Sequence, residues 1–218
     1  MTLPLKHVIA SSLLVASIAL GSLAKAEMAN MAQEHMGHVT ESWGDTPEEK
    51  GLLPTAIAEA EIAAYHAGIA ASQTGDLVWM QDHAKHVLHA IDPDTIAAGP
   101  GLGYGVLRGA AGTAKHITIA AHQDDASENV KIHSVHVATS ATNTVARIAV
   151  LKGNIAQILA ADTAEMAAPA ALEMAKVSQQ LLVGFDANGD GEITWDINEG
   201  GLNESAKHMQ IMRAGEGL

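Results

Sequence analysis

The sequence contains no cysteine, and this absence excludes several classes of function. Without thiolates the chain cannot form Cys-ligated zinc sites, iron–sulfur clusters, thiol nucleophiles or covalently attached c-type haem. Aromatic residues are also scarce, at 3% of the chain, and Phe185 is the single phenylalanine. The core must therefore consist of Ala, Ile, Leu and Val, which favours closely packed helices over a β-sandwich.

Common catalytic motifs are missing as well. The chain has no E-x-x-H, which a di-iron carboxylate bundle requires, and neither H-E-x-x-H nor G-x-S-x-G occurs. The segment 99–105 is dense in glycine but lacks the Lys-Ser/Thr ending of a phosphate loop. We interpret it as a crossover between helices. These absences lead us to expect a binding protein and not an enzyme.

The N-terminal residues have the features of a secretory signal peptide. Lys6 precedes an apolar run over 8–20, and Ala24-Lys25-Ala26 has the small–x–small form of a cleavage site. An uncleaved anchor is the alternative, but the run is shorter than the roughly 20 residues that span a bilayer. We expect residues 1–26 to be removed and the protein to be periplasmic or secreted, with no membrane partner after cleavage.

The composition of the remaining chain favours cations as ligands. The whole chain carries a net charge of -13, and loss of Lys6 and Lys25 changes it to -15. Such a surface repels nucleic acid and attracts metal ions. Twelve histidines and nine methionines are many for this length, and imidazole is a common ligand of zinc, copper and nickel. A protein partner is not indicated.

Hydrophobic periodicity predicts an all-α fold. Residues 27–50 show no sustained period, and we interpret them as a flexible arm whose Met and His side chains either collect copper or form only a linker. The residues of that arm that would bind copper, if it is not only a linker, are Met28, Met31, His35, Met36 and His38. Helices are expected over 52–73, 77–91, 106–123, 127–160, 163–182 and 202–213.

The sequence also repeats itself with a shift of 50 residues. This shift superimposes three histidines on three others, within a shared pattern H-x-x-I-A-A-x-Q and H-x-x-H-V. Duplicated helical hairpins explain such a period, and two hairpins form a four-helix bundle. We therefore expect a bundle over 51–162, with both interhelical turns at the same end.

The repeated histidines are candidate ligands of a transition metal. They are His66, His83 and His86 in the first copy and His116, His133 and His136 in the second copy. Because His66, His83, His116 and His133 lie at similar distances from their turns, the bundle is expected to bring them to one level. The remaining two histidines should flank that site. Ordinary packing of neutral imidazoles in a helical core is the alternative interpretation.

A motif near the C-terminus resembles the calcium loop of EF-hand proteins. Asp186, Asn188 and Asp190 occupy the first ligand positions, Gly191 the bend, and Glu192 and Thr194 the later positions. The twelfth position, however, is Ile197 instead of the usual glutamate, so we expect Glu199, or alternatively Asp196, to complete the site. The resemblance implies Ca²⁺ binding by a helix-loop-helix over 163–218. A turn that binds nothing is the alternative.

The helical region resembles a second family, the periplasmic small metal-binding proteins. The likeness rests on Tyr65-His66-Ala67, Asp82-His83-Ala84-Lys85 and His89-Ala90 in Ala-rich helices that follow a signal peptide. This resemblance implies a His-rich four-helix bundle that binds divalent transition metals such as copper or nickel. It nominates the same six repeated histidines. Compared with that family, this chain has fewer histidines per helix, and it also contains the glycine loop and the calcium-like loop.

Together these observations predict an exported metal-binding protein for metal homeostasis or storage. Its ligands would be Ca²⁺ in the C-terminal loop and copper, nickel or zinc at the bundle histidines. A non-covalent haem or electron-transfer protein using paired histidines is the alternative, although scarce aromatic residues disfavour a haem pocket.

Overall fold

The computed structural model describes residues 30–218, and the expected signal peptide lies outside these residues. The described chain is all-helical, with seven α-helices, two short 3-10 helices and no strand. The α-helices are α1 (Met31–Thr40), α2 (Leu52–Ser72), α3 (Leu77–Ile91), α4 (Val106–Ala121), α5 (Glu128–Ala160), α6 (Ala164–Val183) and α7 (Leu202–Glu216). The 3-10 helices are η1 (Pro47–Glu49) and η2 (Pro93–Thr95).

Local sequence signals explain where these helices begin. The side chains of Asp76, Ser127 and Thr163 each accept a hydrogen bond from the third residue after them, at the starts of α3, α5 and α6. These caps satisfy amide groups that would otherwise have no partner at a helix start. The helix ranges predicted from periodicity are therefore confirmed to within a few residues from α2 onward.

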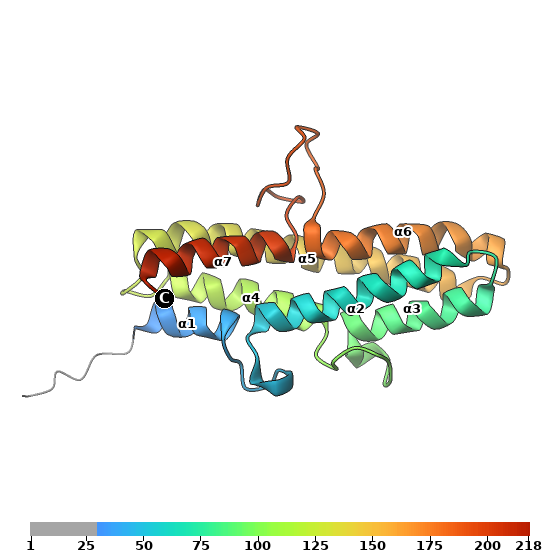
Figure 1. Ribbon diagram of the computed structural model, residues 1–218, viewed down its shortest axis with the longest axis horizontal. Helices are drawn as coiled ribbons and strands as arrows, with labels where there is room; N and C mark the ends of the chain where they lie inside the picture. Colours follow the sequence, from blue (N-terminus) through green and yellow to red (C-terminus); the bar gives the residue numbers. More distant parts are fainter. Residues whose placement is uncertain (1–29) are drawn as a thin grey trace, which may run out of the picture.

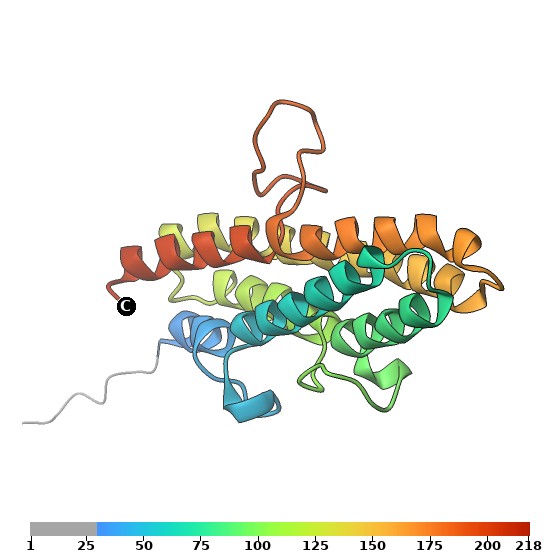
Figure 2. The ribbon, with the colours of Figure 1, turned by 45° about the vertical axis from the view of Figure 1, so that its right-hand side comes forward.

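Helix α5 is the axis of the molecule. Its 33 residues extend over about 50 Å at 1.5 Å per residue. Figure 1 shows α6 and α7 lying end to end along α5, with the α2–α3 hairpin and the α1–α4 pair on the other side. The loop between α6 and α7 projects away from this body, as Figure 2 also shows.

Small residues let these helices approach closely. The core is a single cluster rich in alanine, with Met80, Ile155 and Leu181 among its larger members. At the α2–α4 crossing, a Cβ on Gly109 would lie 2.8 Å from the Cβ of Ala56. Only glycine fits at that contact, so the sequence fixes how near α4 lies to α2.

Residues of the expected flexible arm form a packed helix instead. Within α1, Ala32, Met36 and Val39 are fully buried. The first two amides of the helix, those of Met31 and Ala32, donate to the carboxylate of Asp125. The prediction of a flexible segment was therefore wrong for residues 31–40, because three buried side chains on one face suffice when α4 and α2 supply the opposing surface.

The expected four-helix bundle followed by a separate EF-hand-like unit is not confirmed. Helix α6 packs against α2 and α5, and α7 packs against α5. Val177 of α6 and Met209 of α7 belong to the same hydrophobic core as the other helices. The C-terminal helices are thus part of one helical body, because their apolar faces have no other surface against which to pack.

Candidate metal centres

Nine of the twelve histidines gather in three groups of three. Within each group the candidate ligand atoms all lie within 4.8 Å of one another. We name the groups by their helices. The α1–α4 triad is His35, His38 and His116; the α2–α3 triad is His66, His83 and His86; the α5–α7 triad is His133, His136 and His208.

In every triad one helix contributes two histidines in the motif H-x-x-H-V. The motif occurs three times, at 35–39, 83–87 and 133–137. Residues three apart share one face of a helix, so both imidazoles of a pair point to the same partner helix. The closing valines, Val39, Val87 and Val137, are all fully buried and fix the rotation of their helices against the core.

The third histidine of every triad also has a repeated setting. The pattern A-x-H-x-x-I recurs at 64–69, 114–119 and 206–211. The residue after the histidine is buried in each copy, namely Ala67, Ile117 and Met209. The anchoring of this neighbour holds the single imidazole at the edge of the core, where it meets the pair on the other helix.

The imidazole nitrogens converge at distances typical of metal ligands. In the α1–α4 triad, Nδ1 of His116 lies 3.2 Å from Nδ1 of His35 and 3.3 Å from Nδ1 of His38. Two nitrogens bound tetrahedrally to one zinc ion, each at 2.0–2.1 Å, are about 3.3 Å apart. The observed spacing therefore leaves room for one ion between the rings.

The other two triads have the same geometry. The Nδ1 atoms of His66 and His83 are 2.9 Å apart. Nδ1 of His208 lies 3.0 Å from that of His133 and 3.3 Å from that of His136. Every contact between ring nitrogens in the three triads joins two Nδ1 atoms, so the candidate centres share this feature.

Hydrogen bonding between the rings cannot satisfy all these nitrogens. A neutral Nδ1 carries either one hydrogen or one lone pair, so it makes one good hydrogen bond. Nδ1 of His116 and Nδ1 of His208 each face two other Nδ1 atoms. In the α2–α3 triad, Nδ1 of His86 is buried without a hydrogen-bond partner. A bound cation would satisfy the lone pairs of all three rings at once.

Burial favours the neutral form of several triad imidazoles, which is the form that binds metal. Burial, together with the neighbouring histidines, lowers the pKa of His66 to about 4 and that of His116 to about 4. In the α5–α7 triad, burial first and the neighbouring histidines second lower the pKa of His136. Neutral imidazole is the ligating form, so these sites are prepared for metal at neutral pH.

One triad also has a carboxylate beside a ligand. Oε1 of Glu204 lies 3.1 Å from Nε2 of His208, one helical turn away on α7. Because Nδ1 of His208 faces the triad, this contact orients the ring and selects its tautomer. Carboxylates commonly hold metal-bound histidines in this way.

A tryptophan lies against each triad, and the chain has only three tryptophans. The ring of Trp43 is 4.5 Å from that of His116 and 5.0 Å from that of His38. Trp79 lies 4.6 Å from His83. Trp195 stacks on His136 at 4.1 Å, with an interplanar angle of 19°.

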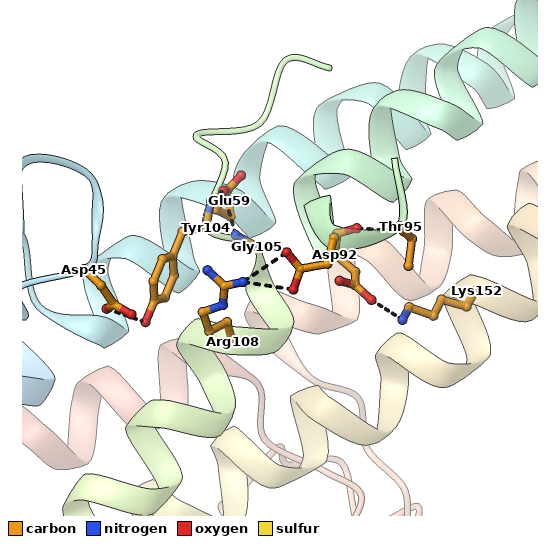
Figure 3. A network of polar contacts seen from close by, with 9 residues as sticks. Asp45, Glu59, Asp92, Thr95, Tyr104, Gly105, Arg108 and Lys152 are labelled. Carbon is orange, nitrogen blue, oxygen red and sulfur yellow. Dashed lines mark hydrogen bonds and ion pairs between the residues drawn. The ribbon is translucent and has the colours of Figure 1, made fainter. Parts of the chain in front are cut away.

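The segment that carries Trp43 is fixed by a polar network. Tyr104 donates its hydroxyl to Asp45, two residues after Trp43 (Figure 3). The buried carboxylate of Glu59 in turn accepts hydrogen bonds from the amides of Leu102, Tyr104 and Gly105. Glu59 thereby holds the glycine loop in place, and the loop holds the turn beside the α1–α4 triad.

The predicted single site that brings His66, His83, His116 and His133 to one level was wrong. The structure places these four residues in three different triads. His66 and His83 do meet, but His116 faces α1 instead of the α5 helix that follows it. The 50-residue repeat is present in the sequence, but it does not determine which histidines meet. The packing of α1 against α4 brings His116 to the histidines of α1.

Three ligand candidates were therefore missing from the predicted site. His35 and His38 had been placed in a flexible arm, and His208 lies outside the 50-residue repeat. The sequence contains the signal that identifies them: a third H-x-x-H-V at 35–39 and a third A-x-H-x-x-I at 206–211.

The predicted calcium loop protrudes from the helical body between α6 and α7 (Figure 2). The carboxylate of Asp186 accepts hydrogen bonds from the amides of Gly189, Asp190 and Gly191. The hydrogen bond from the amide of Gly191 is the main cause that lowers the pKa of Asp186. The buried Glu199 accepts from both the amide and the hydroxyl of Thr194.

These contacts do not by themselves establish a calcium site. Asn188 and Asp190 also accept backbone hydrogen bonds within the loop, whereas Asp196 and Glu192 are exposed. Among residues 30–218, the groups of three or more closely spaced donors are the three triads, and the loop carboxylates do not form such a group. Calcium binding therefore remains a prediction from the sequence.

Comparison with known proteins gives no match to a protein-family model, a curated protein or a solved structure. Neither of the two resemblances seen in the sequence is thus supported by a family assignment. No helix within residues 30–218 is long and apolar enough to cross a membrane.

Proposed function

We propose that this is an exported metal-binding protein that holds three transition-metal ions, one at each histidine triad, for metal homeostasis or storage. Copper, nickel and zinc are the ions whose preferred ligands include neutral imidazole. Export rests on the signal-peptide features of residues 1–26, and storage rests on the repetition of one ligand set three times in a small acidic chain.

The observation that supports this proposal best is the convergence of three imidazoles in each triad, with the candidate ligand atoms within 4.8 Å of one another. Nine histidines placed on six helices for packing alone would not be expected to gather in three groups of three. Leaving a buried nitrogen unsatisfied also costs about 1–3 kcal/mol, and at least one Nδ1 in every triad lacks a full partner. Bound ions would remove that cost at all three places.

This geometry favours ion binding over the haem alternative. The two axial histidines of a haem iron stand on opposite sides of a flat macrocycle. Here the three rings of each triad bring their candidate ligand atoms within 4.8 Å of one another, which leaves no space for a macrocycle between them. We also propose a binding role instead of catalysis, since the triads repeat one ligand set and the chain lacks the catalytic motifs considered above.

Titration of the purified mature protein with zinc, nickel or copper tests the proposal directly. Calorimetry and elemental analysis should give three ions per chain. A single substitution in one triad, His66→Ala, should remove one equivalent and leave two, because the triads share no residue.

His122→Ala is the matched control, because His122 is an exposed histidine outside the triads. It should leave all three equivalents in place. If wild-type protein binds no transition metal, or if His66→Ala and His122→Ala bind alike, the triads are only packing contacts.

A further inference from the structure

Each of the three triads has one tryptophan beside it. Each indole is half-buried and lies with its ring centre 4.1–5.0 Å from an imidazole of one triad. The three indoles come from different elements: the turn after α1, the first turn of α3, and the loop between α6 and α7. No common backbone motif explains this placement, so the shared feature is the triad itself.

Each triad supplies three nitrogen donors. The group that lies at the fourth coordination position then decides which ion the triad prefers. A zinc ion bound by three protein ligands takes a water molecule as the fourth ligand. Within the described residues, no triad has a fourth histidine or carboxylate among its closely spaced donors. A large apolar ring beside the donors opposes the entry of that water molecule.

An indole is also a favourable neighbour for a cation. The face of its π-system is negative, and tryptophan gives the strongest cation–π interactions of the aromatic side chains. Removing an ion from water costs more as its charge increases. A dry site with three imidazoles and an indole therefore suits a singly charged ion that accepts three ligands, and it is less suited to a hydrated divalent ion.

We propose that each indole closes the fourth side of its triad and makes the three sites selective for monovalent copper over zinc. This inference rests on the proposed function, since it assumes that the triads bind metal. It goes further by assigning Trp43, Trp79 and Trp195 as residues that determine which ion is bound.

The α2–α3 triad allows the cleanest test, because two aromatic rings touch it. Trp79 packs on His83, whereas Tyr65 meets His66 edge-on at 5.2 Å and is 66% exposed. We would isolate this triad with His116→Ala and His208→Ala in the full mature chain. Association constants for Cu⁺ and Zn²⁺ would then be measured without oxygen, by competition against a chromophoric chelator of each ion.

Trp79→Ala should lower the ratio of the Cu⁺ to the Zn²⁺ association constant by about tenfold, the size expected when a cation–π contact is lost. Trp79→Phe should keep most of the ratio. Both variants lose the hydrogen bond from Nε1 to the carbonyl of Ile69, which is 3.0 Å long, so that the comparison between them isolates the ring. Tyr65→Ala is the control and should leave the ratio unchanged.

Two results would overturn the inference while leaving the proposed function intact. One is binding of both ions with the same ratio in wild type and Trp79→Ala. The other is an equal fall in Trp79→Phe and Trp79→Ala, which would show that the lost hydrogen bond matters and not the aromatic ring. Failure of the wild-type triad to bind either ion would overturn both proposals, and circular dichroism would confirm that each variant is folded.

Discussion

Two imidazoles in every triad are shifted toward the neutral form. Burial is the largest cause, and it lowers the pKa of His35 and His116, of His66 and His83, and of His136 and His208. Protons compete with metal ions for the same lone pair, so a lower pKa weakens that competition. These six imidazoles therefore stay neutral to a lower pH than an ordinary imidazole does.

We therefore expect zinc binding at the α2–α3 triad to persist below pH 6. An ordinary imidazole, with a pKa of about 6.5, is mostly protonated there, whereas His66 with a pKa of about 4 remains neutral. Calorimetric titrations at pH 7, 6 and 5 check this. A loss of affinity that begins at pH 6.5 and reaches about tenfold per pH unit for each of three ligands would contradict it.

The lowered pKa values of the triad histidines should also make the metal-free protein less stable at low pH. Below pH 6.5 the histidines of the unfolded chain become protonated, whereas His66 and His116 of the folded chain remain neutral until the pH approaches 4. The free energy of unfolding therefore has its full value above pH 6.5 and decreases as the pH falls toward 4. Added metal should offset this loss, because it stabilises only the folded state.

At the scale of single elements, periodicity predicted the helices well wherever the helix was long. The range 77–91 agrees with α3 at both ends, and α5 continues through Gly153 without a break. Helix α1 could not be predicted in this way. It has ten residues with Gly37 in its interior, and its stability comes from α4 and from the Asp125 cap, which are distant in sequence.

A metal ion bound at the α1–α4 triad should stabilise the packing of α1 against the rest of the molecule. Helices as short as α1 are marginal in isolation, and α1 carries two of the three ligands of its triad. We expect zinc to slow amide hydrogen exchange in residues 31–40, and His116→Ala to abolish the slowing although His116 lies on α4. Helix α6 carries no triad residue and serves as the internal control. Equal protection of α6 and α1 on adding metal would argue against this local effect.

At the scale of the whole molecule, the site could be predicted only in part. Pattern and spacing nominated six of the nine triad histidines for a bundle site and placed His35 and His38 in a separate copper-binding arm, but their assembly depends on which helices are neighbours. That arrangement follows from contacts such as Gly109 against Ala56 and from the line formed by α6 and α7 along α5. A period in the sequence carries no information on these contacts.

The arrangement distributes the ligands over the fold. One triad joins α1 to α4, one joins α2 to α3, and one joins α5 to α7, so six of the seven helices are linked in pairs. The calcium-like loop stands apart from the α2–α3 triad, since it leaves the body between α6 and α7 (Figure 1). Ions at these two places should therefore act on stability independently.

We expect the thermal shifts produced by calcium and by zinc to be additive when only the α2–α3 triad is left to bind zinc, in the His116→Ala/His208→Ala chain. In the unmodified chain, Trp195 of the calcium-like loop stacks on His136 and links the loop to the α5–α7 triad. An ion at 100 times its Kd stabilises the folded state by about 2.7 kcal/mol, and effects at separate sites add. Asp186→Ala combined with Asp190→Ala should remove the calcium shift and keep the zinc shift. In the same chain, His66→Ala should keep the calcium shift and remove the zinc shift, since the last intact triad is lost. Differential scanning calorimetry with each ion and with both measures these shifts. If calcium leaves the wild-type melting temperature unchanged, the segment 186–199 is a hydrogen-bonded turn, and metal binding by this protein is confined to its histidines.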